Sequence, residues 1–276
     1  MTKPIFIVSS GRSGSALIDK VFKNFPEIES HHEYLCTHVQ HLAMRKYFKL
    51  DKKKETITKL KKIYLPAIEF SQKKYFVDSS NKLSWLIPEL REIFPKSKFI
   101  FFVRNGKNVV SSFYNKLFDE AYDDESVKRI INFLKSSDHN LEPPPEKKYW
   151  WPIPLDNLEN FSKIGQFERL CFYWNEVNMY IKKDLDCYIP KRDFRMLKLE
   201  RFTSEKEYAK RLFNFLKVEF SNEIFEEIKV PHNVNIPKDF GLTKNQSEIF
   251  KKICHESMKI FNYDENEYYE NKYKKI

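Results

Sequence analysis

The sequence predicts an α/β protein in which a central parallel β-sheet is flanked by helices. Three observations support this prediction. Short apolar segments rich in β-branched and aromatic residues are typical of strands buried on both faces. Stretches with apolar residues three and four positions apart alternate with these segments, as helices do in β-α-β units. Three of the five glycines fall where strand-like segments end.

Length and composition exclude several classes of protein. The chain has 276 residues, of which 41% are hydrophobic and 16% aromatic. This richness in apolar residues excludes a disordered or collagen-like protein. No run approaches the roughly 18 consecutive apolar residues that a membrane span needs. The sequence shows no internal repeat and no linker between two cores, so we expect a single domain over residues 1–276.

Charge and cysteine content bear on partners and compartment. The balance of 49 basic against 39 acidic residues gives a net charge of +10, which implies an anionic partner. Nucleic acid, a membrane surface and a small polyanion all fit this charge. The first four residues lead directly into a strand-like segment rather than a signal peptide, which predicts a cytoplasmic protein. The spacing of the four cysteines predicts reduced thiols rather than a zinc site or disulfide framework; they are Cys36, Cys171, Cys187 and Cys254.

The chain begins with a strand, a glycine-containing loop and a helix. Residues 4–8 read Pro-Ile-Phe-Ile-Val, a continuous apolar run that suits a buried strand. Residues 9–15 follow and contain Gly11 and Gly14, where the backbone can turn tightly or approach a ligand. Apolar residues then recur with helical spacing from Ala16 to Phe25.

The same succession occurs twice more. Residues 75–77 and 99–103 predict two further strands, and each is followed by a helix-like segment, at residues 85–94 and 109–117. Strands that alternate with helices in this way favour a parallel sheet with right-handed crossovers.

The second half of the chain is mostly helical in pattern. Apolar residues have helical spacing at 167–181, 208–216 and 247–261, and residues 194–199 predict one more strand. Five prolines between residues 136 and 154 exclude regular structure there and predict a loop. The fold class is therefore α/β with a helix-rich C-terminal half.

The loop at residues 9–15 is a candidate anion site. Backbone N–H groups of a loop that enters a helix point at one spot, where the helix dipole adds about half a positive charge. Arg12, Ser13 and Ser15 add donors, so we expect a phosphate-like ligand; the alternative is a serine-rich turn with no ligand. A kinase-type P-loop carries a Lys after its second Gly. This loop lacks that Lys, which disfavours magnesium-dependent nucleotide hydrolysis.

Two motifs together resemble sulfotransferases that use 3′-phosphoadenosine 5′-phosphosulfate (PAPS). Phe6 to Leu17 is similar to the strand and Arg-Ser-Gly-Thr-Thr-Leu loop that open this family, and Phe25-Pro26 and Glu33 follow as the family's pattern does. Residues 99–112 resemble its second motif, in which an Arg is followed eight residues later by a Ser. Weaker similarities extend over most of the chain. The resemblance implies the P-loop-like sulfotransferase fold.

The resemblance also implies a role for each motif residue. Arg12 would bind the 5′-phosphosulfate and stabilise the leaving phosphate, while Arg104 and Ser112 would hold the 3′-phosphate. Glu33 would act as the base that removes the proton from a hydroxyl or amine acceptor, leaving 3′,5′-adenosine bisphosphate (PAP) as the product. No metal would be required. Further donors to the phosphosulfate would come from Ser13, Gly14, Ser15, Ala16 and Leu17.

The sequence departs from the family pattern at three places. Ala16 stands where the family has a second Thr, which removes one hydroxyl from the phosphate cradle. Residues 78–80 read Asp-Ser-Ser where the family often has a Lys, so Lys82 is the candidate substitute. Leu199 stands where some members have a Tyr, so the residue that stacks on adenine is not identified.

Several alternatives stay open from the sequence. Glu33 is either the base or an ordinary helix or loop carboxylate, and His31 and His32 are rival bases. A metal site is a further alternative for this region, whose candidate ligands are His31, His32, Glu33, Cys36, His38 and His41. A P-loop-type nucleotide or nucleoside kinase with a degenerate loop is a second possible function, and a non-catalytic nucleic-acid-binding module is a third. We expect a sulfotransferase with a small-molecule or glycan acceptor and no nucleic-acid partner. Its acceptor pocket would form from residues 33–70 and 119–161.

Overall fold

The computed structural model describes residues 2–117, 121–139, 152–230 and 241–263. The chain divides into two compact units. The first, here called the sheet unit, comprises residues 1–104 and 180–234, and the second, the helical unit, comprises residues 105–179 and 235–276. The single domain expected over residues 1–276 stays a prediction.

The sheet unit is built on five parallel strands in the order β2-β3-β1-β4-β5. They are β1 (Lys3–Ser9), β2 (Ile28–His32), β3 (Tyr75–Ser79), β4 (Lys98–Val103) and β5 (Phe194–Lys198). The predicted fold class and four of these strands are confirmed. Strand β2 was not predicted, because its sequence Ile-Glu-Ser-His-His is polar at all but one position, as suits a strand at the sheet's edge.

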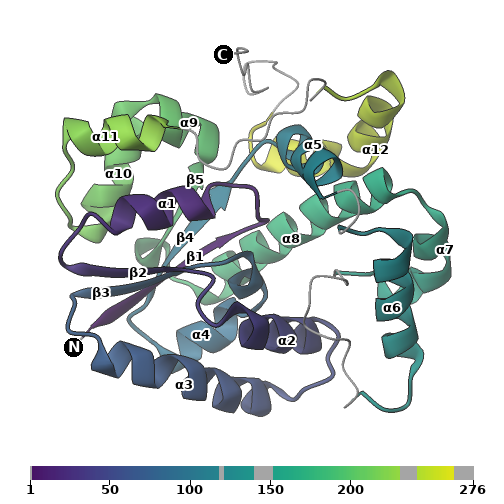
Figure 1. Cartoon of the computed structure of the whole chain (residues 1–276), viewed down its shortest axis with the longest axis horizontal. Coiled ribbons are helices and arrows are strands. Elements are labelled where there is room, and N and C mark those ends of the chain that lie inside the picture. The colour runs from purple at the N-terminus through teal and green to yellow at the C-terminus, as the bar shows by residue number, and fades with distance from the viewer. Residues whose placement is uncertain (1, 118–120, 140–151, 231–240, 264–276) are drawn as a thin grey trace. The chain divides into compact units, whose positions relative to one another are not determined.

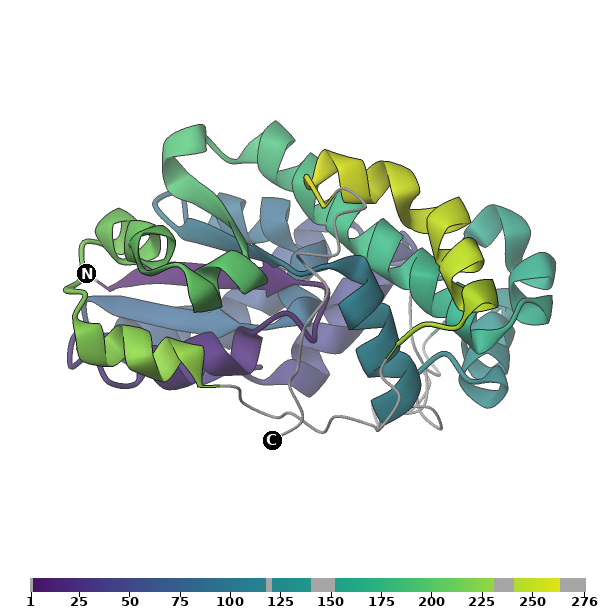
Figure 2. The ribbon, with the colours of Figure 1, turned by 90° about the horizontal axis from the view of Figure 1, so that it is seen from above.

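Helices cover both faces of this sheet (Figures 1 and 2). One face carries α1 (Ser15–Phe22), α9 (Leu199–Ser204), α10 (Lys206–Leu216) and α11 (Asn222–Lys229). The other face carries α2 (Cys36–Tyr47), α3 (Lys53–Phe70) and α4 (Ile87–Ile93). Two short 3-10 helices complete the unit, η1 (Asn81–Trp85) and η3 (Lys191–Asp193).

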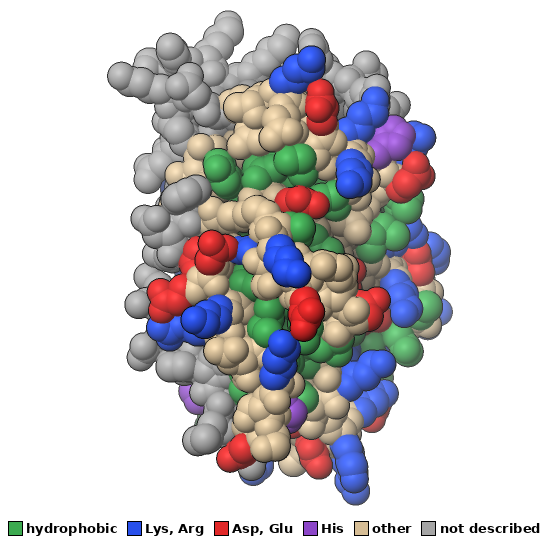
Figure 3. Space-filling view, turned by 90° about the vertical axis from the view of Figure 1, so that its right-hand side faces the viewer, with side chains coloured by type: hydrophobic (Ala, Val, Ile, Leu, Met, Phe, Trp, Pro, Cys, Tyr) green, Lys and Arg blue, Asp and Glu red, His purple; other side chains and the backbone are tan. Residues whose placement is uncertain are grey.

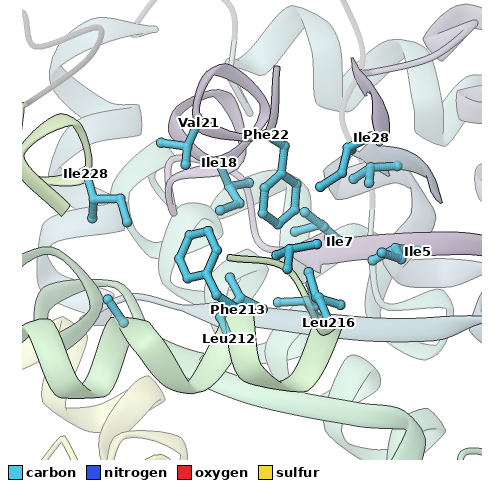
Figure 4. Packing of buried hydrophobic residues seen from close by; sticks show 14 of the residues in the cluster. Ile5, Ile7, Ile18, Val21, Phe22, Ile28, Leu212, Phe213, Leu216 and Ile228 are labelled. Atoms are coloured by element: carbon cyan, nitrogen blue, oxygen red, sulfur yellow. The ribbon is translucent and has the colours of Figure 1, made fainter. Parts of the chain in front are cut away.

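The core explains why the first strand is continuously apolar. Successive side chains of a strand point to opposite faces, and every residue of β1 after Lys3 is buried. Ile5 and Ile7 face the helices α1 and α10, whose apolar side chains converge on them in Figure 4. Phe6 points the other way, against the ring of Tyr64 in α3, at 5.7 Å between centroids.

The helical unit contains η2 (Leu155–Asn157) and the helices α5 (Gly106–Lys116), α6 (Asp124–Lys135), α7 (Leu158–Lys163) and α12 (Lys244–Ile260), while α8 (Gln166–Tyr188) has residues in both units. The helices predicted at residues 109–117, 167–181 and 247–261 are confirmed. Much of the loop predicted around residues 136–154 lies outside the described residues, as does part of the predicted acceptor segment 119–161.

Positive charge is dispersed on the surface that Figure 3 shows. Lys and Arg side chains there alternate with Asp and Glu and do not form a continuous basic stripe of the kind that binds nucleic acid. Within the described ranges, no helix combines the length and apolarity needed to cross a membrane.

Candidate functional site

The predicted site residues of the sheet unit follow the carboxyl ends of neighbouring strands. The glycine-containing loop follows β1, Glu33 follows β2, Lys82 lies three residues after β3, and Arg104 follows β4. Because the strands are parallel, these residues lie at one edge of the sheet. From adjacent strands β1 and β3, the chain continues to helices on opposite faces, α1 and α4 (Figure 1). Ligands of open α/β sheets bind at such a switch point.

The loop between β1 and α1 turns through left-handed backbone conformations. The φ angles are 75° at Gly11, 52° at Arg12 and 93° at Gly14. At Gly14 the packing also requires glycine, since a Cβ atom would lie 2.5 Å from Cδ1 of Leu199. Arg12 has a Cβ, so its left-handed conformation costs roughly 1–2 kcal/mol and must be held by its surroundings.

Hydrogen bonds of serine hydroxyls stabilise the conformation of this loop. The hydroxyl of Ser13 donates to the carbonyl oxygen of Gly11 (2.9 Å) and lies 3.1 Å from Oγ of Ser10. Ser84 in η1 holds the start of the loop: its Oγ donates to the carbonyl of Ser9 (2.9 Å) and accepts from the same residue's N–H (3.2 Å). Since the Ser13 hydroxyl is buried and engaged within the loop, we expect its backbone N–H rather than its side chain to meet a ligand.

The start of helix α1 supplies further donors. Its first intrahelical hydrogen bond runs from the N–H of Ile18 to the carbonyl oxygen of Gly14 (3.0 Å). The N–H groups of Ser15, Ala16 and Leu17 precede this bond and have no acceptor within the helix. Together with the helix dipole they form an arrangement that binds anions, so the residues present fit a phosphate-like group.

Arg104 supports the loop from the end of β4. Its Nη1 donates to the carbonyl oxygen of Arg12 at 2.8 Å, and its side chain is buried. This bond fixes the left-handed residue of the loop and places a permanent positive charge beside it.

Glu33 and Lys82 form an ion pair at the same edge. Nζ of Lys82 donates to Oε1 of Glu33 at 2.9 Å. The Glu33 side chain is 33% exposed, so a substrate can reach it, and the Lys82 side chain is 17% exposed. The predicted substitute for the family's Lys therefore lies beside the predicted base.

The rival bases have structural partners. Nε2 of His31 lies 2.9 Å from Oε1 of Glu29, and its ring packs against Phe76. Nδ1 of His32 lies 2.9 Å from the carbonyl oxygen of Ser79. In the described ranges, no three His, Cys, Asp or Glu residues are grouped so that they could hold a metal ion.

The N-terminal half of the chain matches a known protein family. Residues 4–135 match the Sulfotransferase family. The predicted similarity to sulfotransferases is confirmed for this part of the chain, while the use of PAPS stays a prediction. No curated protein sequence matches the chain.

Solved sulfotransferase structures resemble the chain over nearly its whole length. A sulfotransferase from Alicyclobacillus acidocaldarius is 11% identical, with a TM-score of 0.55 over 98% of this chain and 100% of that one. A sulfotransferase from Mycobacterium avium is 10% identical, with a TM-score of 0.55 over 95% and 77%. The sulfotransferase domain from the curacin biosynthetic pathway is 14% identical, with a TM-score of 0.50 over 91% and 97%. At these identities the similarity shows the fold, which is the sulfotransferase fold.

The two residues predicted to hold a 3′-phosphate belong to different units. Arg104 is the last residue of the sheet unit's first segment, whereas Ser112 lies in α5 of the helical unit, where it is buried. Their predicted joint role at a 3′-phosphate stays a prediction.

Asp78, the fourth residue of β3, lies at the same edge of the sheet, and the sequence does not reveal its role. Its Oδ2 accepts from the hydroxyl of Tyr64 (2.6 Å) and its Oδ1 accepts from the N–H of Tyr34 (3.1 Å). Burial raises the pKa of Asp78 to about 7; these two hydrogen bonds oppose the shift and the nearby charge of Glu33 adds to it. An acidic residue within the buried strand Tyr-Phe-Val-Asp-Ser is the signal that could have revealed it, because such residues are almost never buried without partners.

Proposed function

We propose that this protein is a sulfotransferase that transfers the sulfuryl group of PAPS to a hydroxyl or amine of a small-molecule or glycan acceptor and releases PAP. The observation that supports this most directly is the loop after β1. Its left-handed Arg12, held by Arg104, lies in the loop that leads into the free N–H groups of α1, within the stretch that matches the Sulfotransferase family.

Residues of the loop after β1, together with Arg104 and Ser112, would hold the donor. PAPS, when bound, supplies a sulfuryl group attached to a phosphate leaving group. Arg12 and the N–H groups of residues 13–17 bind the 5′-phosphosulfate and stabilise the negative charge that develops on the leaving phosphate. The loss of one such preorganised donor typically costs about 3 kcal/mol of transition-state stabilisation. Arg104 and Ser112 bind the 3′-phosphate, which distinguishes PAPS from ATP.

Glu33 acts as the base in this proposal. It takes the proton of the acceptor as the acceptor oxygen or nitrogen attacks the sulfur in line with the departing phosphate, a step worth about 10²- to 10⁴-fold. Lys82, 2.9 Å from the carboxylate, orients it and adds positive charge beside the transferring group. Glu33 is preferred to His31 and His32 because it stands where the family that the motifs resemble has its base.

Two further features bear on where the acceptor binds and in which compartment the enzyme acts. Residues 33–70, which follow β2, and residues 119–161, which follow α5, are each candidate acceptor-binding segments. All four cysteines are free thiols, as is usual in a reducing compartment, and we propose that the enzyme acts in the cytoplasm.

Calorimetric titration with PAP tests this function without knowledge of the acceptor. We expect micromolar binding of PAP, and no binding of ADP or of ATP with or without magnesium. Arg104→Ala should abolish PAP binding. Arg91→Ala is the matched control, because Arg91 also donates to a backbone carbonyl, that of Ser97 at the opposite end of β4 (3.0 Å).

Two results would redirect the assignment. Preference for magnesium-ATP would favour the kinase alternative. Failure to bind PAP together with steeply salt-dependent RNA or DNA binding would favour the nucleic-acid module.

A further inference from the structure

We propose that Asp78 is a positioning residue that holds the proposed base, Glu33, in place through the backbone N–H of Tyr34. The inference rests on the proposed function, because it gives Asp78 a part in the same site. It starts from the turn that follows β2.

This turn has an unfavourable backbone that its surroundings must hold. Glu33 and Leu35, on either side of Tyr34, both have left-handed φ angles, 59° and 44°. Non-glycine residues rarely adopt this conformation, and two within three residues persist only where other interactions determine them.

The end of β3 supplies those interactions. The N–H of Glu33 donates to the carbonyl oxygen of Ser79 (3.1 Å), and the next N–H, that of Tyr34, donates to Oδ1 of Asp78 (3.1 Å). The Asp78 side chain therefore extends the β2–β3 pairing past the last residue of β2. Moreover, the carbonyl of Glu33 accepts from the N–H of Cys36, the first residue of α2.

Asp78 is itself held rigidly. It is fully buried, and its Oδ2 accepts from the hydroxyl of Tyr64, also fully buried, at 2.6 Å. The ring of Tyr34 packs edge-to-face on Phe76 at 5.5 Å and lies 5.8 Å from the ring of Tyr64. A carboxylate locked between α3 and the turn fixes the turn's position relative to the sheet.

The ionisation of Asp78 makes its hydrogen bond with Tyr34 dependent on pH. Glu33, which pairs with Lys82, and Asp19 are the acidic groups that act on it, and His31 lies opposite it on β2. Since burial raises the pKa of Asp78 to about 7, its carboxylate form gains population through neutral pH. A carboxylate accepts a hydrogen bond more strongly than a carboxylic acid, so the hold on Tyr34 tightens as pH rises.

Amide hydrogen exchange resolved at Tyr34 tests the proposal without an acceptor. Asp78→Ala should speed exchange at Tyr34 at least tenfold and leave the affinity for PAP within about threefold. Asp78→Asn keeps an acceptor oxygen and should protect the Tyr34 amide from exchange. Unlike in the wild-type protein, this protection should not increase between pH 6 and pH 8. Tyr75→Phe is the matched control, since it removes another buried tyrosine hydroxyl of the sheet unit, one that donates to the carbonyl of Leu216 (2.5 Å), and should leave Tyr34 unchanged.

Turnover provides the second readout. With a hydroxyl compound that the wild-type protein sulfates, Asp78→Ala should lower kcat at least tenfold while the KM for PAPS stays within about threefold. Wild-type exchange at Tyr34 in Asp78→Ala, or unchanged kcat, would overturn the proposal. If Asp78→Ala does not fold, Tyr64→Phe replaces it, with faster exchange at Tyr34 expected and unchanged exchange overturning the proposal. A wild-type protein that fails to bind PAP would overturn the proposed function instead, while exchange at Tyr34 would still decide whether Asp78 holds the turn.

Discussion

Arg12 and Glu33, the two residues proposed to do the chemistry, share an uncommon backbone conformation. Both are left-handed, with φ of 52° and 59°, and both are held by hydrogen bonds from or to neighbouring strand ends, through Arg104 and Ser79. Strain of this kind costs of order 1–3 kcal/mol per residue and is concentrated at functional sites. The coincidence adds a structural argument to the motif argument for these two residues.

Removal of the proposed base should separate binding from chemistry. We expect Glu33→Gln to cut turnover at least tenfold and to leave PAP binding nearly intact, because the amide keeps the side chain's shape but cannot accept the proton. Turnover with PAPS and PAP titration of the same preparation measure the two effects. A fully active Glu33→Gln protein would remove Glu33 as the base and direct attention to His31 or His32.

The buried carboxyl of Asp78 should make stability depend on pH. Its pKa in the folded state, about 7, lies above the unfolded value of about 3.9, so the folded state binds more protons between these values. Stability contributed by this group is therefore present below about pH 4 and is lost as pH rises to 7. Between pH 5 and pH 8, the free energy of unfolding should therefore fall by on the order of 2–3 kcal/mol less in Asp78→Asn than in the wild-type protein. Urea unfolding at both pH values measures it; an unchanged pH dependence would contradict it.

At the scale of elements, patterning predicts those with one apolar face or a continuous apolar run. It predicts the approximate positions of β1, β3, β4 and β5, and of α1, α5, α8, α10 and α12. It does not predict β2, whose neighbour β3 supplies the pairing that makes a polar pentapeptide a strand. Propensity cannot reveal a strand of this kind, because its stability comes from its neighbour.

Packing between helices should make one glycine of the helical unit irreplaceable. A Cβ at Gly106, the first residue of α5, would lie 2.7 Å from Cζ of Phe250 and 2.9 Å from the ring of Trp174. We expect Gly106→Ala to destabilise the protein by about 1–3 kcal/mol. Gly241→Ala is the control, since a Cβ there meets nothing within 4 Å, and it should change stability by less than about 0.5 kcal/mol. Equal unfolding midpoints for the two variants would contradict this expectation.

At the scale of the whole molecule, the proposed donor site predicts ligand-linked stability. A ligand that binds only the folded protein at one hundred times its Kd stabilises it by about 2.7 kcal/mol, which raises the Tm of a chain of this size by roughly 5–10 °C. We expect PAP to produce this shift in a thermal melt and ADP at the same concentration to produce none. An equal shift with both ligands would argue against a specific 3′-phosphate site.

Local patterns are sufficient to predict the fold class, the order of most elements and the similarity of residues 4–135 to sulfotransferases, because apolar periodicity and the loop motifs are local. The placement of Lys82 beside Glu33, the hold of Arg104 on Arg12, and the Asp78–Tyr64–Tyr34 contacts were decided only by tertiary structure. Each joins residues that are 14 to 92 positions apart. Such contacts exist because parallel pairing aligns the carboxyl ends of strands that the sequence separates, and no local pattern records that alignment.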